Sequence, residues 1–165
     1  MLLPTKSILF ATDLSENADY ALRYALSIAE AQQAEVHVLH VMEPLSLNAM
    51  VTFNLFISDE AGREKAIESR HIAMKEALMD NQKHFVQSLS ASEKQAYASV
   101  NSADLVEGHA VEGILSRAKR LNCDLIVLGT HEHSTTQTFL GSVALGVLRR
   151  SPIPVLVVPP KKESS

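Results

Sequence analysis

The feature that most constrains the fold is a regular alternation along the chain. Short aliphatic or β-branched runs are separated by longer stretches whose apolar residues recur every three or four positions. Runs that are apolar on both faces are typical of a parallel sheet covered by helices on both sides. The expected strands are 7–12, 36–41, 96–106, 124–128 and 152–158. The pattern therefore predicts a doubly wound α/β fold with right-handed crossovers.

Helical spacing occupies the stretches between these runs. Ser15 is a good N-cap for a first helix, and a long second helix should follow Ser58. Two further helices are expected at 111–121 and 141–150. The apolar stripe of the first comprises Ala18, Ala21, Leu22, Ala25, Leu26 and Ala29. The stripe of the second comprises Ile67, His71, Met74, Leu78, Phe85 and Leu89. We expect both stripes to pack in the core.

Two segments fit this pattern poorly. Polar residues dilute 96–106, which predicts a strand at the edge of the sheet. The segment 43–57 is an irregular apolar excursion that is too long for a tight connection. An insertion of this kind indicates either a lid over a site or an interface patch.

Length and composition indicate a single globular domain. The chain has 165 residues, 46% of them hydrophobic and 21% charged. We expect a domain over 1–160 and a mobile tail at 161–165. The net charge of -4, without a basic block, argues against nucleic acid as a partner. Because Cys123 is the only cysteine, it cannot form an internal disulfide, and we expect it to be a small buried apolar residue.

The amino-terminal residues run directly into the first strand, without an apolar signal core. Nowhere in the sequence is an apolar run long enough to cross a bilayer. These two observations predict a cytoplasmic protein that has no membrane partner.

Candidate ligand-binding residues follow strands one, two and four. In an open α/β sheet, ligands bind beyond the carboxyl ends of the strands. A helix that begins near Gly141 would add free backbone N–H groups suited to phosphate. The residues at these positions are Ala11, Thr12, Asp13, Val41, Gly129, Thr130, Gly141 and Ser142. Their layout predicts a nucleotide pocket.

Three segments carry a family resemblance that covers nearly the whole chain: ILFATDLSENADYALRYALSIA, VLHV and DLIVLGTHEHSTTQTFLGSVALGVLRRSPIPVLVVP. They resemble the universal stress proteins. The resemblance implies a five-stranded parallel sheet of order 3-2-1-4-5, an adenine-nucleotide alpha-hydrolase-like fold. It also implies a dimeric stress-response module whose protein partner is unknown. Because no Ser-His-Asp or Cys-His arrangement stands out in the linear sequence, we do not expect an enzyme.

The resemblance also assigns sides of the nucleotide site. It implies that Asp13 and Val41 lie at the base and ribose, and that Gly129 and Thr130 lie at the phosphates. The residues implied at the helix entrance are Gly141, Ser142 and Val143.

The phosphate loop departs from the family pattern in two ways. Glu132 stands where ATP-binding members have a second glycine, and the stretch from there to Gly141 is one residue short. A glutamate brings a like charge toward a triphosphate, and 129–142 contains no Lys or Arg. We therefore expect weakened phosphate binding. The ligands that remain compatible are ATP, with Mg²⁺, and AMP, which has fewer phosphates.

The histidines do not form a convincing metal site. His131 and His133 flank Glu132 on a polar loop, which is more typical of a solvated surface than of ligands with a fixed third partner. Strand alternation predicts that His37 and His40 point to opposite faces, so we take both as structural or surface residues rather than ligands. We therefore expect no bound metal.

The last strand predicts an interface. The residues 155–158 form an aliphatic strand, which at a sheet edge would leave unpaired backbone groups on an apolar strip. The family resemblance implies a homodimer in which these strands pair, and three nearby prolines would limit the length of that pairing. The residues concerned are Val155, Leu156, Val157 and Val158.

Two other functions compete with the nucleotide-binding module. One is a dimeric module of the same family that binds partners without ATP. The other is a receiver-like signalling domain, for which Thr130 and Asp104 would be needed at the site. Asp13 has no adjacent acid, so that second alternative is incomplete.

Overall fold

The computed structural model describes residues 3–130 and 140–161. Five parallel strands form one sheet of order β3-β2-β1-β4-β5. Their bounds are β1 Ser7–Ala11, β2 Glu35–Met42, β3 Val100–Glu107, β4 Leu125–Gly129 and β5 Val155–Val158. The predicted fold class and strand order are confirmed. The domain boundary at 160 stays a prediction, and the tail at 162–165 lies outside the described residues.

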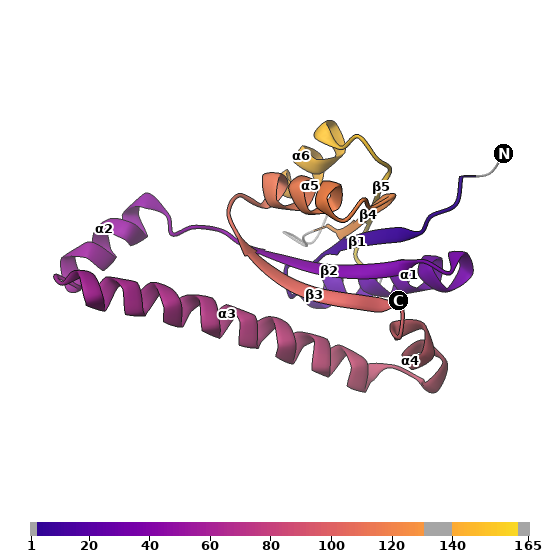
Figure 1. The fold of residues 1–165 in the computed structure, drawn as a ribbon, viewed down its shortest axis with the longest axis horizontal. Coiled ribbons are helices and arrows are strands. Elements are labelled where there is room, and N and C mark those ends of the chain that lie inside the picture. The colour runs from indigo at the N-terminus through magenta and orange to yellow at the C-terminus, as the bar shows by residue number, and fades with distance from the viewer. Residues whose placement is uncertain (1–2, 131–139, 162–165) are drawn as a thin grey trace.

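Helices cover both faces of the sheet (Figure 1). One face carries α5 and α6, and the opposite face carries α1, α3 and α4. The bounds are α1 Glu16–Gln32, α2 Leu47–Phe56, α3 Glu60–Ser88, α4 Ala91–Tyr97, α5 Ala110–Arg120 and α6 Ser142–Arg150. Alternate residues of β1 serve the two sides: Ile8 and Phe10 pack with α1, and Leu9 packs with α5 and α6.

The strand order excludes the receiver alternative. Receiver domains use the order 2-1-3-4-5, in which the third strand lies inside the sheet. Here β3 is an edge strand, and Asp104 lies in its middle rather than at its carboxyl end. The Asp104 carboxylate accepts a hydrogen bond from Arg117 Nη2 at 2.5 Å. Burial works against the charged form of Asp104, but the bond from Arg117 holds its pKa below the usual value.

The sequence prediction missed α4. Ala96 and Tyr97, assigned to strand three, lie in this helix, and β3 starts at Val100. A capping box begins α4: Ser90 accepts from the Glu93 N–H, and the Glu93 carboxylate accepts from the Ser90 N–H. The signal that the sequence offered for this helix is the spacing from Ser90 to Glu93, which is typical of a helix start.

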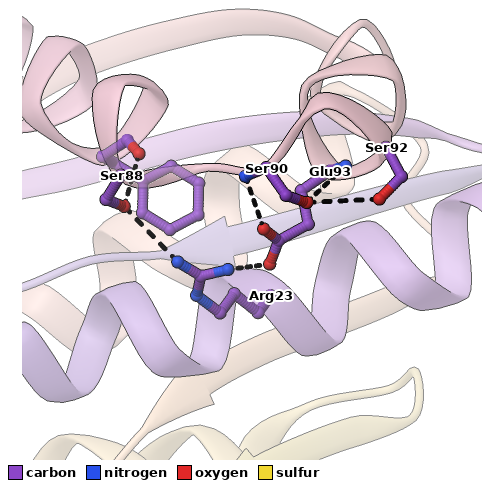
Figure 2. A network of polar contacts seen from close by, with 6 residues as sticks. Arg23, Ser88, Ser90, Ser92 and Glu93 are labelled. Atoms are coloured by element: carbon purple, nitrogen blue, oxygen red, sulfur yellow. Dashed lines mark hydrogen bonds and ion pairs between the residues drawn. The ribbon is translucent and has the colours of Figure 1, made fainter.

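One arginine ties α4 and the end of α3 to α1 (Figure 2). Arg23 of α1 pairs with the Glu93 carboxylate and donates a hydrogen bond to the Ser88 hydroxyl at 3.4 Å. Its guanidinium also lies 5.5 Å from the centre of the Phe85 ring. The same carboxylate therefore caps α4 and docks it onto α1.

The segment 43–57 and the first half of α3 differ from the prediction. The irregular excursion contains α2, in which no residue is buried. The expected core stripe of α3 is buried at Leu78 and Phe85, but Ile67 is 52% exposed. In Figure 1, α2 and the start of α3 form an arm that reaches away from the sheet. The prediction of a fully buried α3 stripe was wrong.

No helix among the described residues is long and apolar enough to cross a membrane. Cys123 is buried as expected, and burial raises the pKa of its thiol above the usual value.

Candidate functional site

A pocket opens where the carboxyl ends of β1, β2 and β4 meet the starts of α1, α5 and α6. Its volume is about 660 Å³ including the opening to solvent, which is within the range of small-molecule sites. Strand residues form its floor and helix N-termini its rim. The lining residues are Ala11, Thr12, Asp13, Ser15, Asn17, Ala18, Leu39, His40, Val41, Ala110, Ile114, Leu128, Gly129, Thr130, Gly141, Val143 and Ala144.

The structure brings most of the sequence-predicted residues together at this pocket. Ser142 is the exception, since it is the first residue of α6 but is absent from the lining. Glu132, His131 and His133 lie outside the described residues. The predicted residues that line the pocket are Ala11, Thr12, Asp13, Val41, Gly129, Thr130, Gly141 and Val143.

The turn after β1 is fixed by its own side chains. Thr12 Oγ1 accepts a hydrogen bond from the N–H of Leu14, which has a positive φ of 66°. The Asp13 carboxylate accepts from the N–H and the hydroxyl of Ser15, at 3.0 and 2.5 Å. Ser15 in turn caps α1 by accepting from the Ala18 N–H. Asp13 is therefore held at the rim of the pocket.

Asn17 is a lining residue that the sequence analysis did not identify. Its side-chain Nδ2 donates to the backbone carbonyl of Thr130 and so joins the start of α1 to the end of β4. A Cβ on Gly129 would come within 3.1 Å of this nitrogen, so the glycine makes room for Asn17. A polar residue at the start of the helix after strand one was the available signal.

Two oxygens in the same place lack a hydrogen-bond partner. Asn17 Oδ1 and Thr130 Oγ1 are buried, and neither is paired within the described part of the chain. Buried polar atoms in native proteins nearly always have a hydrogen-bond partner. Two such oxygens without a partner in the described structure, on residues that line a pocket, therefore favour a polar ligand there.

His40 also lines the pocket, on β2. Its Nδ1 lies 2.8 Å from the Thr12 carbonyl oxygen, which can only accept, so Nδ1 carries a proton. The prediction gave His40 a structural or surface role. The hydrogen bond is structural, because it links β2 to the turn after β1, but the residue is also part of the pocket wall.

The start of α6 provides the positive end of a helix dipole. Its N-cap is Gly141, which supplies no side-chain cap, and its first turn contains no acid. The first amide N–H groups of such a helix are available to an anion. None of the described lining residues is a lysine or arginine. Any phosphate in the pocket would therefore depend on backbone groups, on the helix dipole or on a cation.

No cluster of three or more His, Cys, Asp or Glu residues suited to a metal ion occurs within 3–130 and 140–161. The suggested loop histidines fall outside that part of the chain.

Comparison with known proteins agrees with this architecture. Universal stress protein MJ0577 of Methanocaldococcus jannaschii is 29% identical over 154 residues, which cover 93% of this chain and 94% of that protein. The solved structure of MJ0577 has a TM-score of 0.62 at 26% identity and covers 98% of this chain and 100% of its own. Universal stress protein A homolog 1 of Coxiella burnetii is 31% identical over 153 residues, with 93% and 95% coverage.

A universal stress protein crystallised in complex with cAMP shares the fold. Its TM-score is 0.60 at 21% identity, and the similarity covers 95% of this chain and 98% of its own. The sequence profile of the universal stress protein family matches residues 4–159, which is nearly the whole chain. The chain therefore belongs to the universal stress protein family.

Proposed function

We propose that this protein is a stress-response regulatory module that binds an adenine nucleotide in the pocket at the carboxyl ends of its strands. The observation that carries the proposal is the start of α6, which has no side-chain cap and borders a pocket lined by Asn17 and Thr130, each of which has a buried side-chain oxygen without a hydrogen-bond partner among the described residues. A relative of the same fold was crystallised with cAMP, which supports a nucleotide as the ligand class.

The chemistry of the pocket favours few phosphates. One helix N-terminus can balance about half an elementary charge, and the described wall adds no basic side chain. Glu132 would add a negative charge to the sequence between β4 and α6. We infer that a nucleotide with one phosphate, such as AMP or cAMP, binds more tightly than ATP, and that ATP depends on Mg²⁺.

Polar groups on the other side of the pocket suit a nucleoside. The Asp13 carboxylate lies at the rim after β1, where it could accept from ribose hydroxyls. Leu39, Val41 and Ile114 are apolar wall residues suited to a base. The proposed contacts are those that the family resemblance implies: Asp13, Val41, Gly129, Thr130, Gly141, Ser142 and Val143.

Isothermal titration calorimetry with AMP, cAMP and ATP, with and without Mg²⁺, tests the proposal. We expect AMP or cAMP to bind at least tenfold more tightly than metal-free ATP. Thr130→Val, which removes the unpaired hydroxyl at nearly constant volume, should weaken binding about tenfold. Thr52→Val in α2 is the matched control and should leave binding unchanged.

Failure of all three nucleotides to bind at millimolar concentration would contradict the proposal and favour the alternative, a module that binds protein partners without a nucleotide. The variant Glu132→Gly distinguishes the effects of the two departures from the family pattern, which are the glutamate at 132 and the missing residue before Gly141. A gain in ATP affinity would identify the carboxylate as the obstacle, and no gain would point to the missing residue.

The role we propose is binding rather than catalysis. Ser15 donates its hydroxyl to Asp13 and caps α1, and His40 uses Nδ1 on the Thr12 carbonyl. These three side chains therefore have structural partners in place of a nucleophile–base alignment. We also propose a cytoplasmic location, where adenine nucleotides are available.

We also propose that β5 pairs with its counterpart in a homodimer. The carbonyls of Pro154 and Val158 accept from β4, so the alternate N–H groups of Val155 and Val157 face the open edge. Val157→Pro removes one outward donor without removing a bond to β4. Sedimentation should then show an assembly of lower mass than wild type, and an unchanged mass would contradict pairing at this edge.

A further inference from the structure

The helix α2 is uncharged and mostly apolar, with apolar side chains distributed around it, and yet it is exposed. The ten residues Leu47–Phe56 contain no charged side chain, and none of them is buried. Leu47, Leu55 and Phe56 are 77%, 78% and 85% exposed. A helix that is apolar all round is normally found buried. The surface of α2 therefore needs a covering partner.

This helix is held in a defined position. Ser46 caps it by accepting from the Ala49 N–H at 3.2 Å, and Asp59 caps α3 by accepting from the Gly62 N–H at 2.9 Å. Arg63 Nε donates to the Ile57 carbonyl at 2.9 Å and fixes the corner between the two helices. The apolar surface is thus presented by an ordered hairpin, which reduces the entropy lost on association.

The base of the hairpin is braced against the sheet. Arg70 Nη2 donates to the Glu43 carbonyl at 2.6 Å, at the end of β2, and Arg70 Nη1 lies 3.9 Å from Glu107 of β3. No residue of α2 lines the nucleotide pocket. Of the two roles that the sequence suggested for this insertion, the described structure favours an interface over a lid.

We name the exposed apolar side chains of α2 and of the first half of α3 the arm patch. It comprises Leu47, Met50, Val51, Leu55, Phe56, Ile67 and Ile72. At about 70 Å² of apolar area each, seven such side chains give roughly 500 Å². Two copies burying this area together would remove about 1,000 Å², the lower bound for a specific interface.

The charges around the arm patch narrow the choice of partner. Helix α2 carries no charge, and 60–70 of α3 carries three acids and three bases in balance. An anionic membrane surface would call for basic residues beside the apolar face. A strongly charged protein partner would call for a net charge of the opposite sign. A second copy of the same arm requires neither basic residues nor a net charge. When two copies of α2 meet, no like charges face each other because α2 has no charged residue.

We propose that the arm patch is an interface between two copies of this chain, related by a two-fold axis that lies at the arm. Such an interface uses the same residues on both sides, so every contact occurs twice. It is separate from the β5 edge, because α2 lies on the arm that projects away from the sheet in Figure 1, whereas β5 is the edge strand opposite β3. A chain with both interfaces would assemble beyond a dimer.

The experiment uses the full chain with Leu55→Glu and Phe56→Glu combined. Each carboxylate would face its own copy across the axis, so we expect the association constant at the arm to fall at least about 100-fold. Both side chains are largely exposed, so the thermal midpoint of the dissociated chain should stay unchanged. Ser69→Glu, which adds a charge at another exposed position on α3, is the matched control.

Sedimentation equilibrium of four proteins gives the answer: wild type, the arm variant, Val157→Pro and the combination of the last two. With both interfaces, wild type is a tetramer or larger, each variant is a dimer and the combination is a monomer. If wild type is a dimer that only the arm variant dissociates, the arm proposal stands and the β5 pairing fails.

Three results would overturn the arm proposal. One is that wild type and the arm variant have the same assembly mass at every concentration at which both proteins are soluble. Another is dissociation by Ser69→Glu to the same extent. The third is a monomeric wild type that co-sediments with phosphatidylcholine vesicles while the arm variant does not, because the arm would then be a membrane contact.

Discussion

The two halves of α3 differ in what covers them, although the same apolar stripe runs along both. In the second half, Leu78, Gln82 and Phe85 are buried, and Leu78 and Phe85 belong to the core that α1 forms with the sheet. In the first half, Ile67 is 52% exposed, and the helix leaves the sheet together with α2. The periodicity of a helix defines its apolar face, but the presence of a covering layer depends on the length of its neighbours.

Length explains the difference. The 29 residues of α3 extend roughly 43 Å. The eight residues of β3, the strand beside it, extend roughly 26 Å. The first turns of α3 therefore project past the end of β3. The buried half stabilises the domain, and the projecting half is available for association.

The largest effect that tests this comparison is expected at Phe85. Phe85→Ala removes a buried ring that packs against Tyr97 and lies under the Arg23 guanidinium. The cavity should lower the free energy of unfolding by about 3–5 kcal/mol, measured by urea denaturation. A loss below about 1 kcal/mol would mean that the second half of α3 is not a core element.

A smaller effect is expected at Tyr97, whose hydroxyl donates to the buried Gln82 Oε1 at 3.1 Å. Tyr97→Phe leaves that oxygen unpaired and should cost about 1 kcal/mol near pH 8.

The same hydroxyl predicts a dependence on alkaline pH. Burial raises the pKa of Tyr97, so its contribution is fully present below the unfolded value of about 10 and is lost as pH rises through the folded value. Urea denaturation across this range should show the stability gap between wild type and Tyr97→Phe narrowing above about pH 10. A gap that widens there would contradict the burial of the hydroxyl.

An effect on the arm alone is expected from Arg70→Ala, which removes the brace to Glu43 and Glu107. Amide hydrogen exchange in α2 and the first half of α3 should become about fivefold faster, while exchange in β1 and β4 is unchanged. Lys75→Ala, an exposed change on the same helix, is the control. Equal exchange rates in both variants would show that the brace does not order the arm.

The smallest effect is expected at Phe56, the counterpart of Phe85 in the arm. At a protein concentration low enough to keep the chains apart, Phe56→Ala should change the free energy of unfolding by less than about 0.5 kcal/mol. The contrast with Phe85 then isolates burial as the cause, since the same side chain is removed. A loss similar to that of Phe85→Ala would mean that α2 packs within its own chain.

Much of the fold could be predicted from the sequence because its strands are buried on both faces and its α1 stripe is continuous. The pocket residues could be predicted because parallel strands end at the same edge. Helix α2 was missed because its apolar residues are distributed around the helix and do not form a stripe that periodicity can detect. Asn17 was missed because its partner, the Thr130 carbonyl, lies 113 positions along the chain. Spatial contacts of this kind leave no local pattern.

The arm also has a consequence for folding kinetics. Helices α2 and α3 are consecutive and form through local contacts, whereas β1 must wait for β4, more than a hundred residues later, to complete its pairing. The arm can therefore be present while the sheet is still open, and its apolar surface is then exposed alongside unpaired strands. During synthesis this is the period of greatest risk of aggregation, so early contact between arms would also protect the folding chain.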